Sequence, residues 1–126
     1  MPAQTAYVPG VCNINRDEIA YRRKWRNIGA VSTIVLTVTL FIVSSNRWIR
    51  LSIFLPAFIA AIGYLQAKNK FCVSYAASGL QNAAEDSTKA DKVSKEAHKL
   101  DQAKARKMNI QAALVALAIT VLAVAA

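Results

Sequence analysis

The sequence predicts an all-α integral membrane protein with three transmembrane helices: an N-terminal hairpin and a C-terminal span. The main observation is that residues 28–43, 51–67 and 109–126 contain no charged side chain and are mostly apolar. An apolar helix of about 18 residues is roughly 27 Å long, close to the ~30 Å thickness of a hydrocarbon core. The charged residues, 18% of the chain, lie before the first of these runs and between them. Buried helices of a soluble domain are therefore the weaker interpretation.

The distribution of Lys and Arg predicts the orientation of the chain in the membrane. Of 16 cations, five precede the first apolar run, nine lie in residues 68–107, and only Arg47 and Arg50 lie between the first two runs. The positive-inside rule then places the N-terminus in the cytoplasm and the C-terminus on the opposite side, most simply in a bacterial cytoplasmic membrane. Anionic lipid headgroups are the expected partners of this charge, at ~1 kcal/mol per cation near the surface. Nucleic acid is not expected as a partner.

The same pattern divides the chain into five segments. The first apolar run is longer than the core of a signal peptide and follows a long polar arm, so we expect it to be a retained helix. The segments are a basic cytoplasmic N-terminal arm at 1–26, transmembrane helices at 27–45, 48–67 and 109–126, and, at 68–108, a cytoplasmic interfacial segment followed by a long charged helix.

The cytoplasmic segments carry their own local signals. Asn15 followed by Glu18 predicts an N-cap for a helix that begins near Asp17, after an irregular arm. Gly79 predicts a break after the second span. The Ala- and Lys-rich stretch that follows favours a helix from about Ala83 to Met108, capped by Asn82, with Glu85 and Asp86 in its first turn and ion pairs such as Asp101 with Lys104. A helix continuous with the third span would be ~60 Å long.

Small residues recur at helical spacing within the spans, which predicts close contact between helices. We expect these faces to pack against other spans of this chain or against partner subunits. Pro56 predicts a kink in the second span, because proline removes a backbone donor and crowds the carbonyl of Ser52. The packing residues are Gly29, Thr33, Thr37, Ala57, Ala60, Ala61, Gly63, Ala112, Ala116 and Thr120, and the expected interfacial anchors are Trp25, Arg26, Trp48, Arg50, Lys68 and Lys70.

The sequence offers few residues for chemistry. The apolar runs contain no Asp, Glu, Lys or His, the usual marks of proton-coupled transport. Cys12 and Cys72 are both expected on the cytoplasmic side as reduced thiols. They have no CxxC spacing and no nearby histidine cluster, so neither a metal site nor a cofactor is expected. Because both flank the same interface, they could approach each other in the fold, and a redox, lipid-attachment or shared-metal role stays open.

Three functions fit this composition. The favoured hypothesis is a non-enzymatic structural or accessory subunit that associates with a larger membrane complex or with itself. The alternative is a pore made of several copies, whose water-lining residues would be Ser32, Thr33, Thr37 and Thr39. The third is a membrane-bound redox factor that uses Cys12 and Cys72.

Overall fold

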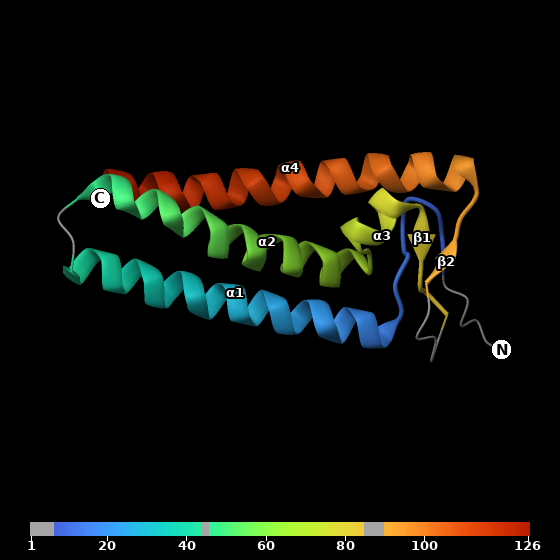
Figure 1. Cartoon of the computed structure of the whole chain (residues 1–126), viewed down its shortest axis with the longest axis horizontal. Helices are drawn as coiled ribbons and strands as arrows, with labels where there is room; N and C mark the ends of the chain where they lie inside the picture. The colour runs from blue at the N-terminus through green and yellow to red at the C-terminus, as the bar shows by residue number, and fades with distance from the viewer. Residues whose placement is uncertain (1–6, 44–45, 85–89) are drawn as a thin grey trace.

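The computed structural model describes residues 7–43, 46–84 and 90–126, and it is mostly helical. Within these residues three helical segments are long and apolar enough to cross a membrane: Arg16–Val43, Arg47–Asn69 and Lys95–Ala125. The predicted fold class is confirmed to that extent. The last two residues of the helix predicted at 27–45, and the predicted first-turn acids Glu85 and Asp86, lie outside the described residues. The elements are α1 (Arg16–Val43), the 3₁₀ helix η1 (Arg47–Ile53), α2 (Phe54–Asn69), α3 (Val73–Ser78), β1 (Leu80–Gln81), β2 (Asp91–Lys92) and α4 (Lys95–Ala125) (Figure 1).

Helix α1 joins the basic arm and the first apolar run in one element. Asn15 stands before its first turn, and the Asn15 side-chain oxygen accepts a hydrogen bond from the Glu18 amide at 3.0 Å. The predicted N-cap is therefore confirmed. Asp17 and Glu18 lie in the first turn, where negative charge is favourable. The basic residues Arg22, Arg23 and Arg26 thus lie on the same helix as the apolar residues that follow them.

The second apolar segment begins as a 3₁₀ helix and continues as an α-helix. The Asn46 side chain caps η1 by accepting from the Trp48 amide at 3.0 Å. Pro56 is the third residue of α2. In a first turn the missing N–H of proline leaves no α-helical hydrogen bond unmade. Pro56 therefore lies at the junction of two helix types, where we had expected a kink inside one continuous helix.

A sharp turn follows α2. Lys70 adopts a left-handed conformation with φ of 55°, and the Phe71 amide returns to the Gln66 carbonyl at 3.0 Å. This geometry is common at helix ends but is rare for a residue with a side chain. Phe71 is fully buried. Helix α3 then ends at Gly79, with φ of 72°, at the predicted break.

The helix expected from Ala83 to Met108 is wrong in its first part. Residues Leu80–Gln81 and Asp91–Lys92 pair as a short antiparallel ladder, with Leu80 opposite Lys92. Helix α4 begins only at Lys95, where the Ser94 side chain accepts from the Ala97 amide at 3.1 Å. Asn82 does not cap a helix, because Ala83 and Ala84 after it are not helical. Its backbone amide instead donates to the Asn13 carbonyl at 2.8 Å. A contact with the distant N-terminal segment thus overrides local helix propensity.

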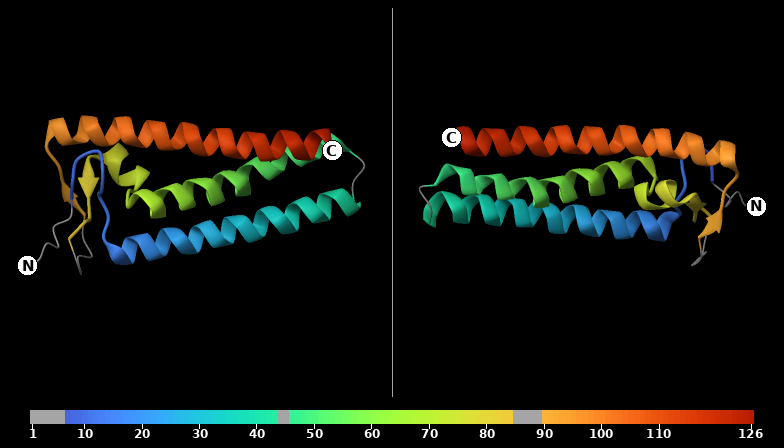
Figure 2. Two further views of the ribbon diagram at one scale, coloured as in Figure 1. Left: turned by 180° about the vertical axis from the view of Figure 1, so that it is seen from behind. Right: turned by 45° about the horizontal axis from the view of Figure 1, so that its top comes forward.

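From Lys95 to Ala125, α4 is unbroken and combines the charged segment with the third apolar run. Its 31 residues correspond to about 46 Å of helix. Figures 1 and 2 show α2 between α1 and α4, with all three helices nearly side by side. At the end of the bundle that holds η1, the core contains Leu40 of α1, Ile53 of η1 and Ala123 of α4.

Two glycines set the distance between α1 and α2. A Cβ atom on Gly29 would lie 2.5 Å from the Ala60 nitrogen, and one on Gly63 would lie 2.9 Å from the Arg26 nitrogen. Only residues without a side chain permit such backbone contact. On α4 the small residues Ala112, Ala116 and Thr120 are buried. The small-residue faces of α1, α2 and α4 therefore pack against other helices of this chain.

Candidate functional site

Many of the polar residues that the structure describes lie at one end of the bundle, here called the polar cap. It consists of the N-terminal loop at 7–15, the first turns of α1, the turn at 70–72, helix α3, the β1–β2 ladder with Asn82, and the first turns of α4 (Figures 1 and 2). The opposite end holds η1 and the end of α4. There Arg50 packs over the Phe41 ring at 3.9 Å and donates to the Ala123 carbonyl at 3.1 Å.

Asn13 is the centre of the polar cap and is fully buried. Its side-chain oxygen accepts from the Cys72 amide at 2.6 Å, and its side-chain nitrogen donates to the Cys72 carbonyl at 3.1 Å. Its backbone amide donates to the Lys70 carbonyl at 3.1 Å. One asparagine thus pairs with both backbone groups of Cys72, whose carbonyl also accepts from the Ala76 amide at 3.1 Å, and closes the turn after α2. An isolated buried amide would be unfavourable, and this pairing removes that penalty.

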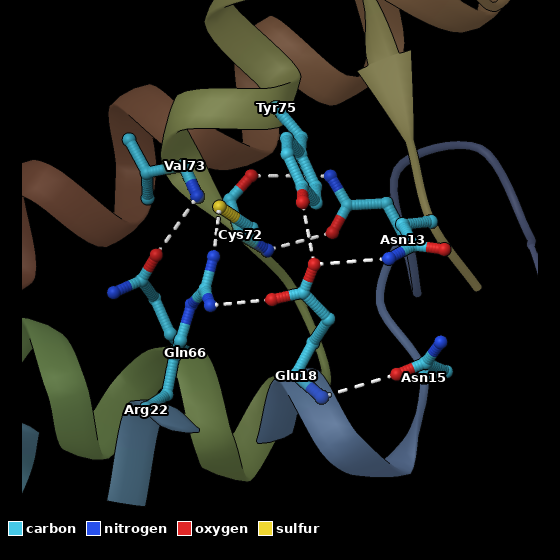
Figure 3. A network of polar contacts seen from close by, with 9 residues as sticks. Asn13, Asn15, Glu18, Arg22, Gln66, Cys72, Val73 and Tyr75 are labelled. Carbon is cyan, nitrogen blue, oxygen red and sulfur yellow. Dashed lines mark hydrogen bonds and ion pairs between the residues drawn. The ribbon is translucent and has the colours of Figure 1, made fainter. Parts of the chain in front are cut away.

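A second cluster surrounds Glu18 (Figure 3). One carboxylate oxygen accepts from Arg22 at 2.8 Å, and the other accepts from the Tyr75 hydroxyl at 2.5 Å and from the Asn82 side chain at 3.0 Å. Arg22 also donates to the Cys72 sulfur at 2.7 Å. Glu18 therefore connects α1, α3 and the start of the ladder. These side chains bind chain segments to one another, which is the pattern of a structural network.

The network sets the protonation of its members. Burial disfavours the charged form of Glu18, but hydrogen bonds from Tyr75 and Asn82 and the positive charge of Arg22 outweigh it and lower the carboxyl pKa. Burial, followed by the hydrogen bond to Glu18, raises the pKa of Tyr75 to about 12. At neutral pH a charged carboxylate thus accepts from a neutral hydroxyl.

The lowered pKa of Glu18 predicts acid sensitivity of the polar cap. Because the folded-state pKa is below the unfolded value, the stabilisation is present above the unfolded pKa and is lost as pH falls through the folded pKa. We expect Glu18→Gln to lower the thermal unfolding midpoint in detergent at pH 7 and to have a smaller effect near pH 3. The matched control is Glu96→Gln, an exposed acid in the first turn of α4. An equal Glu18→Gln effect at both pH values would contradict the assignment.

Asp101 anchors the N-terminal loop to α4 and was not identified from the sequence. It is fully buried. Its two carboxylate oxygens accept from the Tyr7 hydroxyl at 2.8 Å and from the Gly10 amide at 2.7 Å. The sequence predicts an ion pair between Asp101 and Lys104, which the structure does not form. Lys104 instead reaches the Asn69 side-chain oxygen at 3.3 Å.

Both cysteines lie in the polar cap as buried free thiols. They have different partners: the Cys12 sulfur donates to the Ile14 carbonyl at 3.6 Å, whereas the Cys72 sulfur accepts from Arg22. Among the described residues, no group of three or more His, Cys, Asp or Glu side chains is arranged to hold a metal ion. The structure thus brings both cysteines to one end of the bundle and gives each a separate environment.

The remaining predicted residues fall into two groups. Thr33 and Thr120 use their hydroxyls within their own helices, donating to the Gly29 and Ala116 carbonyls at 2.7 Å. Thr37 is half-buried on α1. The anchors Trp25, on α1, and Trp48, on η1, are both exposed. The predicted residues that line a groove between α1, α2 and α4 are Thr33, Ala57, Ala60 and Ala61.

No protein-family model, curated protein sequence or solved structure matches this chain.

Proposed function

We propose that this protein is a non-enzymatic structural or accessory subunit of a membrane complex. Three spans hold it in the bilayer, with the N-terminus and the polar cap on the cytoplasmic side and the C-terminus opposite. The cation asymmetry of the sequence supports this orientation. The polar cap supports a structural role, because Asn13, Glu18 and Asp101 are each engaged in contacts between distant segments.

One observation carries the proposal of a protein partner: apolar side chains are exposed on the polar cap. Val8, Val11 and Leu100 are 47%, 55% and 54% exposed. They belong to one contact region, since Gly10 packs on the Leu100 side chain. Leu100 precedes the third apolar run by about nine residues, or about 14 Å of helix, so acyl chains do not reach it. An apolar surface beyond the lipid is typical of a site of protein contact.

The test is the mass of the complex extracted in detergent from cells that make a tagged chain at its native level. We expect a defined assembly with other chains in fixed proportion. A Val11→Ser, Leu100→Ser double variant should elute as the lone protein while its far-ultraviolet circular dichroism is unchanged. The control is Lys99→Ser with Ala103→Ser, which alters two other exposed positions of α4. A wild-type protein that elutes alone, or only with copies of itself, would overturn the accessory role.

A further inference from the structure

The bundle contains an apolar groove that its own side chains do not fill. Its volume is about 470 Å³, and α1, α2 and α4 all contribute to it. Ala57, Ala60 and Ala61 of α2 form its floor. Ala30 and Ile34 of α1 form one wall, and Val115 and Ile119 of α4 form the other. The groove lies along the segments that are apolar enough to cross a membrane, so an apolar occupant fits it.

Tyr64 and Gln111 are the polar residues at the end of the groove that faces the polar cap. Tyr64 also lines a second, smaller pocket of about 110 Å³, whose other lining residues include Arg23, Arg26 and Lys68. The two pockets therefore meet at one side chain. The Lys68 ammonium lies 5.8 Å from the centre of the Tyr64 ring, which places this cation beside the junction.

Helical spacing explains why cations lie next to the end of the groove that faces the polar cap. On α1, Arg23 and Arg26 precede Ala30 by seven and four residues, so they share its face. On α2, Lys68 follows Tyr64 by four residues. On α4, Lys107 precedes Gln111 by four residues. Each helix that lines the groove thus presents a basic residue at the same end. We call Arg23, Arg26, Lys68 and Lys107 the basic collar.

The basic collar has unsatisfied charge. Over the residues that the structure describes, the one ion pair joins Glu18 and Arg22, and neither of these residues belongs to the basic collar. Arg26 donates to the neutral side chain of Asn27 at 3.0 Å. Several cations gathered without acidic partners at the mouth of an apolar groove are complementary to a ligand with an anionic head and an apolar tail.

We propose that the groove and the basic collar form a site for one anionic phospholipid. An acyl chain lies along α2 between α1 and α4, and the phosphate is bound by Arg23, Arg26 and Lys68. Arginine suits this role because its planar guanidinium donates two parallel hydrogen bonds to phosphate. The Tyr64 hydroxyl and the Gln111 amide stand at the level of the ester groups, where polar side chains are favourable. This site differs from the apolar patch on the polar cap and does not depend on a protein partner.

Charge complementarity favours a lipid over a helix of a second subunit. A helix in the groove would leave the basic collar without a counter-charge, whereas a phospholipid supplies one in the same molecule. The groove lies between α1 and α4. An occupant there would pack against the α2 residues that line it.

The experiment is native mass spectrometry of the purified full-length protein, titrated in detergent with phosphatidylglycerol and, separately, with phosphatidylcholine. We expect one tightly bound phosphatidylglycerol per chain and weaker binding of phosphatidylcholine. The Arg23→Gln, Lys68→Gln variant should weaken phosphatidylglycerol binding about tenfold or more, because it removes two cations at the phosphate. The matched control is Lys24→Gln with Lys70→Gln, which changes the net charge equally at exposed positions outside both pockets.

A groove-filling variant tests the acyl-chain part of the site. Ala61→Phe adds a ring to the groove floor and should abolish the one-to-one binding of both lipids. Equal losses in the two charge variants would mean that the lipid senses only the overall charge, and would overturn the site. Undiminished binding to Ala61→Phe would overturn the groove as the acyl-chain position. A wild-type dimer that becomes monomeric in Ala61→Phe, with lipid binding unchanged, would identify a second copy as the occupant.

Discussion

Replacing Asn13 is expected to detach the N-terminal loop from the polar cap and to destabilise the protein. Asn13→Ala removes the buried acceptor for the Cys72 amide. It also removes one of two donors to the Cys72 carbonyl, which keeps its bond from the Ala76 amide. A buried group left without a partner costs about 1–3 kcal/mol, so we expect a loss of that size in the free energy of unfolding.

Asn13→Asp removes the side-chain donor of Asn13 without changing the volume of the side chain. Aspartate keeps the shape of asparagine and can still accept from the Cys72 amide, but it places a carboxylate against the Cys72 carbonyl. We expect it to be at least as destabilising as alanine at pH 7, because a buried unpaired charge is strongly unfavourable. The measurement is hydrogen exchange of the backbone amides of residues 12–15 and 70–73 in detergent. Exchange rates that match those of the wild type in both variants would contradict the central position of Asn13.

The second large effect is expected at Gly29. Because a Cβ there would lie 2.5 Å from the Ala60 nitrogen and 2.9 Å from its Cα, α1 and α2 must move apart to accept even a methyl group. The obstacle is backbone and cannot rotate away. We expect Gly29→Ala to cost about 1–3 kcal/mol and Gly29→Val to cost more.

The control for Gly29 is on the same helix. Ser32 is exposed on α1, so Ser32→Ala and Ser32→Val place the same two side chains at a position that does not face another helix. Unfolding in mixed micelles of a mild detergent and dodecyl sulfate, followed by circular dichroism, gives the free-energy differences. A graded loss at Gly29 with little change at Ser32 is the expected result. Similar losses at both positions would show that α1 and α2 tolerate a wider separation.

The sequence predicted the features that depend on near neighbours. Apolar runs of sufficient length predicted three helices that are long and apolar enough to cross a membrane, because in lipid every backbone group must be paired within its own helix. The Asn15 cap and the Gly79 break were also predicted, since each involves residues only a few positions apart. These features require no knowledge of the tertiary structure.

The polar cap could not be predicted, because its bonds join residues far apart in the chain. Asn13 and Cys72 are separated by 59 positions, and Tyr7 and Asp101 by 94. Asp101 has the spacing of a surface ion pair with Lys104, and nothing nearby in sequence indicates that a tyrosine and a glycine amide cover it. The late start of α4 has the same origin, since Asn82 is held by Asn13. Only the density of polar side chains around Asn13 and Asn15 was a local sign of this site.

The separation of these partners also fixes an order of events during synthesis. Residues 7–15 leave the ribosome first, but their partners Lys70, Cys72 and Asn82 appear only after α1 and α2 have been made. The carboxylate of Asp101 is made later still, and the Ala123 carbonyl, which accepts from Arg50, is made after that. The loop at 7–15 therefore stays without these long-range partners until α1 and α2 are complete. Because α4 supplies a partner at each end of the bundle, both ends close only once α4 has packed against the other helices.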